Sequence, residues 1–377
     1  MLIVSMLATP LLVGCGSSND TTPRGATAVT TNTPSPISVA AFSDWRAAYV
    51  DSTGNVHAVT IDGKTDLTID RVGDLGIHAL NLPPASVSRD GHLLAFESRR
   101  GLAVHNLTGS SLGQRVPDIG AESQVIWSPN GAQLILDDNQ GAKSVISVAD
   151  GKLNTSPSSL PTLGPVLGWV DNSHIALVTF GTATAGAATS LTIAVADVTS
   201  WALRSVVTMQ MSSLTGEWRF SLSPDGKHIL YYNKRFRSDP YVPTVKELDV
   251  ASGAMTSLPG LARAMGTYSG FTSLAWTADS QKIAASTGFD LNNDLKTWIL
   301  DLRSDKATQL QLPTGRYVAG WAPGTGALIL SSGKDSVVDA GPFTVTVVSL
   351  GAGSNVTETV LTHQAYTFPF VGFVRTA

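Results

Sequence analysis

The segment SLSPDGKHILYYN (221–233) contains the unit from which most of the chain is built. It runs from a serine and leucine into the polar turn Ser-Pro-Asp-Gly and then into a hydrophobic run. Asp-Gly suits the positive backbone torsions that a tight turn between two antiparallel strands requires. The segment therefore predicts a β-hairpin.

The same unit recurs along the chain. It appears as VSRDGHLLAF (87–96), WSPNGAQLIL (127–136), WVDNSHIALV (169–178), LSPDGKHILY (222–231), WTADSQKIAA (276–285) and WAPGTGALIL (321–330). The first positions, 87, 127, 169, 222, 276 and 321, lie 40, 42, 53, 54 and 45 residues apart. Periods of this size are typical of β-propellers, in which each blade is a sheet of four antiparallel strands.

Two further strands follow most of the hairpins. Apolar runs such as Leu102–Leu107 and Thr297–Leu302 predict third strands, and polar turns such as VASGAMTSL (250–258) lead into fourth strands. Charged residues make up only 14% of the chain, which contains 35 Gly and 19 Pro and has no convincing long amphipathic helix. This composition favours an all-β, turn-rich fold, with a stack of two β-sandwiches as the alternative.

The two ends of the chain predict how the ring closes. Phe368–Phe373 reads as an innermost strand without a following partner, while residues 45–69 contain three strands without an innermost one. Joining them would give one composite blade and remove the open edge of the array. We therefore expect a single β-propeller over 44–377 with seven four-stranded blades, six whole and one shared; six or eight blades remain open.

The repeat resembles the TolB-type, WD-like propeller repeat. The resemblance rests on SLSPDGKHILYYN (221–233), VIWSPNGAQLILDDN (125–139) and SLAWTADSQKIAAST (273–287), and it extends over roughly residues 45 to 377. It implies the propeller architecture but no particular activity. TolB has an N-terminal α/β domain where this chain has a low-complexity segment, so the Tol–Pal role is not carried over.

The N-terminus resembles a bacterial lipoprotein signal. Residues 1–14 are uncharged and mostly apolar, and they are too few to span a bilayer. They end in Leu-Val-Gly before Cys15, the one cysteine of the chain, and this resembles the lipobox, whose cysteine is lipidated. Two alternatives stay open: an ordinary secretory signal with Cys15 incidental, and a start codon upstream, because no Lys or Arg precedes Cys15.

Residues 15–43 would follow as the lipidated cysteine and a flexible Ser/Thr/Pro-rich tether. A lipid anchor on Cys15 would place the protein outside the cytoplasm, attached to a membrane of the cell envelope. The net charge of −4 provides no field that would attract nucleic acid, and a monomeric propeller is expected.

No catalytic motif is apparent. The sequence has no phosphate loop, dinucleotide fingerprint or paired metal motif, so we expect no catalytic residues and no cofactor. The only group of oxygen ligands that resembles a cation site contains Asp290, Asn292 and Asp294, without the remaining features of a calcium loop. The repeated Trp127, Trp169, Trp276 and Trp321 are interpreted as core residues packed between blades, with ligand stacking as the alternative.

Loops that join the second strand to the third, and the fourth strand to the next blade, are the expected binding surface. They combine mixed charges with aromatic side chains, which suits recognition of a protein or glycan. The candidate residues are Arg99, Arg100, Lys234, Arg235, Phe236, Arg237 and Tyr241, with Asp137-Asp138 and Lys334-Asp335 in corresponding loops. We expect a non-catalytic lipoprotein that binds a protein or cell-envelope ligand. The alternative is a glycan hydrolase or lyase with carboxylates facing the channel.

Overall fold

The computed structural model describes most of the chain from residue 44 onward. The described ranges are 44–50, 55–60, 64–71, 85–98, 101–107, 115–116, 124–137, 142–158, 160, 163–182, 188–210, 217–234, 244–265, 271–287, 296–312, 316–323, 327–332, 344–350, 356–362 and 368–375. Contacts divide the chain into two units, Met1–Thr33 and Pro34–Ala377, and every described residue belongs to the second. The expected signal peptide (1–14) and tether (15–43) therefore lie outside the described residues.

Six sheets of the described chain are each built from four consecutive strands, and we number them blades I to VI. Blades I to III contain β4 (Ala85–Val87), β5 (Leu93–Ser98), β6 (Gly101–Asn106), β7 (Arg115–Val116); β8 (Gln124–Trp127), β9 (Gln133–Asp137), β10 (Lys143–Ser147), β11 (Leu153–Thr155); and β12 (Leu163–Trp169), β13 (His174–Thr182), β14 (Ala188–Asp197), β15 (Leu203–Gln210). Blades IV to VI contain β16 (Glu217–Leu222), β17 (His228–Lys234), β18 (Thr244–Asp249), β19 (Met255–Ser257); β20 (Phe271–Trp276), β21 (Lys282–Thr287), β22 (Lys296–Asp301), β23 (Lys306–Gln309); and β24 (Arg316–Trp321), β25 (Leu328–Ser332), β26 (Thr344–Leu350), β27 (Val356–Thr362).

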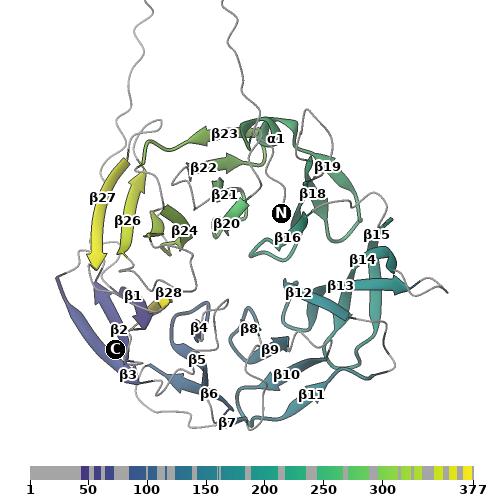
Figure 1. Cartoon of the computed structure of the whole chain (residues 1–377). Helices are drawn as coiled ribbons and strands as arrows, with labels where there is room; N and C mark the ends of the chain where they lie inside the picture. The colour runs from purple at the N-terminus through teal and green to yellow at the C-terminus, as the bar shows by residue number, and fades with distance from the viewer. Residues whose placement is uncertain are drawn as a thin grey trace, which may run out of the picture. The chain divides into compact units, whose positions relative to one another are not determined.

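A seventh four-stranded sheet joins the two ends of the chain. It has the order β28-β1-β2-β3, with β1 at Trp45–Val50, β2 at Asn55–Thr60, β3 at Asp66–Arg71 and β28 at Phe368–Arg375. β28 runs antiparallel to β1, placing Phe373 opposite Ala47. The predicted composite sheet is confirmed. Figure 1 shows the sheets arranged around a central axis, with the first strand of each blade innermost, and this arrangement is a β-propeller.

In blades I, II, IV and V, the repeated turn closes its hairpin through hydrogen bonds of its own side chains. In blade IV the Ser223 hydroxyl donates to Asp225 Oδ1 at 2.6 Å and accepts the His228 backbone N–H at 3.0 Å. Gly226 adopts φ +71° and donates its N–H to the Ser223 carbonyl at 2.9 Å. The turn sets the register of β16 on β17, which pairs Leu222 with Ile229. The Ser-Pro-Asp-Gly sequence thus satisfies its own polar groups while it reverses the chain.

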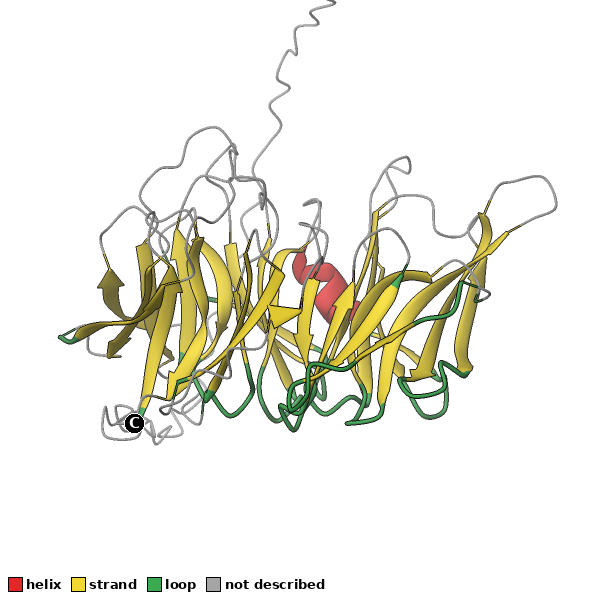
Figure 2. Cartoon of the chain, turned by 90° about the horizontal axis from the view of Figure 1, so that it is seen from below, coloured by secondary structure: helices red, strands yellow, loops and turns green. Residues whose placement is uncertain are grey.

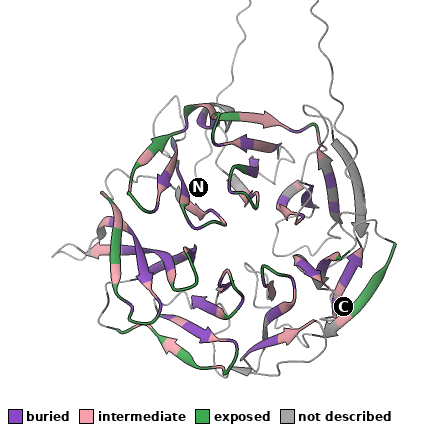
Figure 3. Cartoon of the chain, turned by 180° about the vertical axis from the view of Figure 1, so that it is seen from behind, coloured by how far each residue is buried: buried purple, intermediate pink, exposed green. Residues whose placement is uncertain are grey.

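The hydrophobic core lies between neighbouring blades. The second strands are the most buried, as in β9 and β21, where four and five consecutive residues are buried, whereas the fourth strands β11 and β19 are largely exposed. Figure 3 shows this change from buried to exposed across the blades. One core cluster joins blades II and III through Ile135, Val145 and Ile175, and another joins the composite sheet to blade VI through Ala47, Phe373 and Ile329.

The repeated tryptophans link each blade to the preceding one. Trp127, Trp169 and Trp276 are 8%, 5% and 9% exposed. Their indole N–H groups donate to the Ser86 carbonyl, the Ile126 carbonyl and the Ser221 hydroxyl, and Trp321 donates to the Ala275 carbonyl. All four acceptors belong to the innermost strand of the preceding blade. The interpretation of these rings as core residues packed between blades is therefore confirmed.

Most described turns lie along one face of the ring, which we call the turn face (Figure 2). It consists of the turns between first and second strands and the turns between third and fourth strands. Hydrogen bonds on this face join neighbouring blades. The Asn130 N–H of blade II donates to Asn172 Oδ1 of blade III, and the Asp225 N–H of blade IV donates to Ser280 Oγ of blade V. Arg375 N–H donates to the Gly91 carbonyl, so the composite sheet is joined to blade I on this face.

One short helix interrupts the β structure between blades IV and V. Helix α1 (Pro259–Met265) begins with proline, which suits the first position of a helix. The carboxylate of Asp305 accepts the N–H groups of Gly260 and Leu261 at 2.6 and 3.0 Å, and Leu261 is buried. In the described part of the chain, no helix has the length and apolar character needed to cross a membrane.

Candidate functional site

A cavity of about 710 Å³ opens at the centre of the turn face. The ends of the innermost strands and the turns that follow them form its wall. The lining residues are Arg89 of blade I; Ile126, Trp127, Ser128 and Pro129 of blade II; Leu167, Gly168 and Trp169 of blade III; Leu222, Ser223 and Pro224 of blade IV; Trp276, Thr277, Ala278 and Asp279 of blade V; and Trp321, Ala322 and Pro323 of blade VI. Its size and mainly apolar lining are typical of ligand pockets. We call it the channel-mouth cavity.

One position of the repeat supplies a residue to the rim from almost every whole blade. It is the second residue of the Ser-Pro-Asp-Gly turn: Arg89, Pro129, Pro224, Ala278 and Pro323. Three prolines and an alanine make this rim apolar and rigid, because proline fixes its own backbone torsion. Arg89 replaces proline in blade I and brings a cation to the rim.

Hydroxyl groups in the cavity wall are used by the turns themselves. Ser128 Oγ donates to Asn130 Oδ1 and accepts Gln133 N–H, both at 2.9 Å. Ser223 makes the equivalent pair of bonds, and Thr277 Oγ1 donates to Asp279 Oδ1 at 2.6 Å. These hydroxyls hold the turn in shape. A ligand would therefore meet mainly the pyrrolidine rings, the indole edges and the half-buried leucines of the wall.

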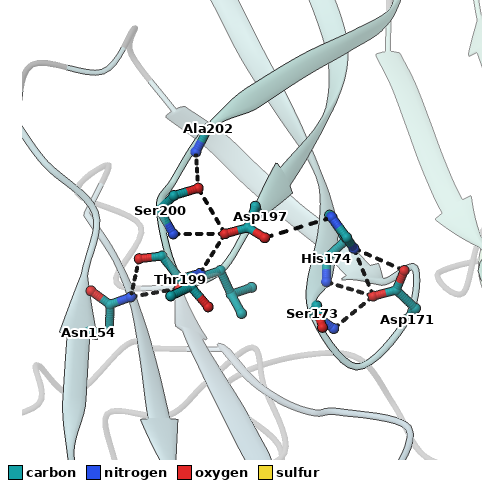
Figure 4. Close-up of polar contacts among 9 residues, drawn as sticks. Asn154, Asp171, Ser173, His174, Asp197, Thr199, Ser200 and Ala202 are labelled. Atoms are coloured by element: carbon teal, nitrogen blue, oxygen red, sulfur yellow. Dashed lines mark hydrogen bonds and ion pairs between the residues drawn. The ribbon is translucent and has the colours of Figure 1, made fainter.

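Aspartates organise the turns between third and fourth strands in the same way. In blade III, Asp197 Oδ1 accepts the Ser200 N–H at 2.7 Å and the Ser200 hydroxyl at 2.8 Å (Figure 4). His174 lies between Asp171 and Asp197, with its Nδ1 2.9 Å from Asp171 Oδ1. The Asn154 amide donates to the Val198 carbonyl at 2.6 Å, which ties the edge of blade II to this turn.

These bonds lower the pKa of the turn aspartates. Hydrogen bonds from Ser252 lower the pKa of Asp249, and hydrogen bonds from Ser304 lower the pKa of Asp301. Burial acts to raise the pKa of Asp90, Asp171 and Asp225, but their hydrogen bonds outweigh it and the net shift is downward. The turn face therefore depends on ionised carboxylates.

We expect the fold to lose stability in acid. Because the pKa of these aspartates is lower in the folded chain than in the unfolded one, their contribution to the free energy of unfolding is present above the ordinary aspartate pKa of about 3.9 and is lost as the pH falls through the lower folded values. Urea unfolding at constant ionic strength should show the free energy of unfolding falling below about pH 5. An Asp249→Asn/Asp301→Asn variant should show a shallower fall, and an unchanged slope would contradict this role.

The structure leaves most of the predicted binding residues outside the described ranges. Cys15, Arg99, Arg100, Arg235, Phe236, Arg237 and Tyr241 lie there, as do the weak cation candidates Asp290, Asn292 and Asp294. Lys234 is described as the last residue of β17. Together with Ser98, which precedes Arg99, it lies at the strand ends opposite the turn face. The structure therefore describes a site at the other end of the ring from the one expected.

Asp137 differs from its expected place in an exposed loop. Its side chain is only 2% exposed, and it forms an ion pair with the 1% exposed side chain of Lys143. Its second oxygen, Oδ2, accepts the Val166 N–H of blade III at 2.9 Å. The expectation of a surface role is wrong for this residue, because the carboxylate is used to join two blades.

The described residues contain no group of three or more His, Cys, Asp or Glu side chains placed to hold a metal ion. The channel-mouth cavity has one carboxylate, Asp279, and one guanidinium, Arg89. Its described lining offers apolar contact, indole surface and two opposite charges on different blades.

Comparison with known proteins gives a likeness of fold. No protein-family model matches the chain, and no curated protein matches it. A chain of the mitotic checkpoint complex aligns over 96% of this chain and 91% of its own length, with 14% identity and a TM-score of 0.51. The two share a fold. The TolB protein of Agrobacterium tumefaciens aligns over 76% of this chain and 98% of its own, at 17% identity and TM-score 0.46. The tricorn protease aligns over 81% of this chain and 33% of its own length, at 13% identity and a TM-score of 0.48.

Sequence reasoning missed the channel-mouth cavity because it treated the repeated turn only as a hairpin connector. The signal that could have revealed it is the variation at one turn position. Arg89, Pro129 and Ala278 differ there, while the flanking Ser/Thr and Asp/Asn positions are retained for the turn's own hydrogen bonds. A position that differs between the repeats of one chain, next to positions that stay the same, marks a surface where the blades can differ in function.

Proposed function

We propose that this chain is a non-catalytic, lipid-anchored β-propeller of the bacterial cell envelope that binds a protein or other envelope ligand. The observation that carries the binding role is the channel-mouth cavity, whose mainly apolar wall and two isolated charges suit non-covalent recognition. The N-terminal segment that ends at Cys15 supports export and lipid anchoring. The basic residues Lys234, Arg235 and Arg237, in the segment that begins at the end of β17, support a second contact surface.

The anchor has a direct test. Cys15→Ala should abolish incorporation of labelled fatty acid and should move the protein from the membrane fraction to the soluble fraction of a bacterial host. Cys15→Ser serves as a second variant with nearly the same size and polarity. Fatty-acid labelling that persists in either variant would overturn the proposed attachment site.

The partner surface can be assigned by pull-down from detergent-solubilised envelopes. We expect recovery of a specific partner by the wild type and a large loss either in Lys234→Ala/Arg235→Ala/Arg237→Ala or in Ala278→Trp, which would fill the channel mouth. Lys152→Ala/Arg303→Ala/Lys306→Ala is the matched control, because it removes the same charge from three exposed turn-face or edge positions. Unchanged recovery in both test variants would overturn both surfaces.

A further inference from the structure

We infer that the channel-mouth cavity recognises a peptide segment that combines a large apolar side chain with a carboxylate, and that Arg89 is the residue that selects the carboxylate. This inference rests on the proposed binding function and specifies its ligand. Arg89 contributes to the cavity wall from blade I and is exposed. No hydrogen bond or ion pair of its guanidinium occurs among the described residues.

The apolar part of the ligand is inferred from the residues that line the cavity wall. Pro129, Pro224 and Pro323 provide three rigid rings around the mouth, and the innermost strand ends add indole and leucine surface. Grooves lined by aromatic side chains bind extended, proline-rich peptide segments, which lose little conformational freedom because their polyproline II conformation is already formed. Sugars are less well matched, because they require many free polar groups and the hydroxyls of Ser128 and Ser223 are occupied within their own turns.

We infer a carboxylate on the ligand because the two charges of the cavity, Arg89 and Asp279, lie on different blades. Asp279 Oδ1 accepts hydrogen bonds from Thr277 Oγ1 and from the Gln281 N–H, so this carboxylate is held by its turn. Its negative charge lies on blade V, whereas the positive charge of Arg89 lies on blade I. A ligand carboxylate is therefore attracted to the Arg89 side of the mouth and repelled from the Asp279 side. The planar guanidinium can hold a carboxylate through two parallel hydrogen bonds, which gives direction as well as attraction.

The test is selection from an immobilised array of random heptapeptides, displayed with either a free or an amidated C-terminus. Wild-type protein should enrich peptides in which Asp, Glu or a free C-terminal carboxylate lies near Trp, Phe, Leu or Pro. Arg89→Ala should weaken binding of those peptides about tenfold or more, the scale of losing a charge-assisted hydrogen bond. Arg89→Glu should exchange the preference from acidic to basic peptides.

Two controls keep the outcome interpretable. Arg303→Glu makes the same charge change at an exposed position in the turn between β22 and β23, outside the cavity, and should select the same peptides as the wild type. Loss of enrichment on amidation would identify a C-terminal carboxylate as the recognised group, and retention would identify an acidic side chain. Identical selection by wild type and Arg89→Glu would overturn the inference. If no peptide is enriched while the envelope pull-down still recovers a partner, this inference fails and the proposed function stands.

Discussion

Replacing Gly226 by alanine is expected to lower the free energy of unfolding by at least about 3 kcal/mol. Gly226 has φ +71°, in a region that disfavours L-residues by about 1 to 2 kcal/mol. An added Cβ would also overlap the carbonyl oxygen of Val170 in blade III and lie 2.6 Å from its carbonyl carbon. Because these are backbone atoms of the neighbouring blade, relief requires that two blades move apart. Urea unfolding would measure the loss.

Gly131 is a matched control for this prediction. It occupies the same turn position in blade II with φ +69°, but the nearest atoms to an added Cβ lie at 3.8 and 3.9 Å. Gly131→Ala should therefore cost only about 1 to 2 kcal/mol, the conformational term alone. Equal losses of stability in the two variants would show that the contact between blades III and IV adds nothing to the cost of Gly226→Ala.

Removing the charge of Lys143 is expected to have the other large effect. Lys143 and Asp137 form a buried ion pair, and Asp137 also accepts the Val166 N–H of the next blade at 2.9 Å. Lys143→Met would remove the Lys143 ammonium from this buried ion pair, and breaking a buried pair on one side costs about 3 to 5 kcal/mol. Chemical unfolding should show this loss, together with looser contact between blades II and III in hydrogen exchange at Val166.

The double variant Asp137→Asn/Lys143→Met separates charge burial from packing. It removes both charges, while the amide oxygen of the introduced asparagine can still accept the Val166 N–H. Its loss of stability should be smaller than that of Lys143→Met alone, because both charges of the pair are removed from the buried site. Lys152→Met, at an exposed position of the same blade, should change the free energy of unfolding by less than about 0.5 kcal/mol. A double variant as unstable as the single one would contradict the ion-pair account.

The architecture was largely predictable because its signals are local and repeated. The turn at 223–226 specifies a hairpin by its own hydrogen bonds, and six copies of it at blade-like spacing predict the whole blades. The composite sheet required one more step, the match between an unpaired strand at each end of the chain. The expected core role of the repeated tryptophans followed from the same periodicity.

The details that depend on contacts between blades could not be predicted in this way. Asp137 reads as a polar residue at the end of a strand, and only the fold brings Lys143 and the Val166 N–H to it. Gly151 of blade II and Gly253 of blade IV occupy the same position of the turn between third and fourth strands. In blades III and V this position is held by Trp201, at φ 59°, and by Asp305, at φ 50°, which also caps helix α1. The channel-mouth cavity is a further case, since its wall comes from six blades and no single repeat contains it.

The composite sheet makes completion of the ring depend on β28. β1, β2 and β3 leave the ribosome first, yet the inner partner of β1 is β28, the last described strand to be synthesised. Until then β1 presents an unpaired edge, and such edges invite association with other chains. A chain that is cut before Phe368 would lack β28 and would keep the inner edge of β1 open to other chains.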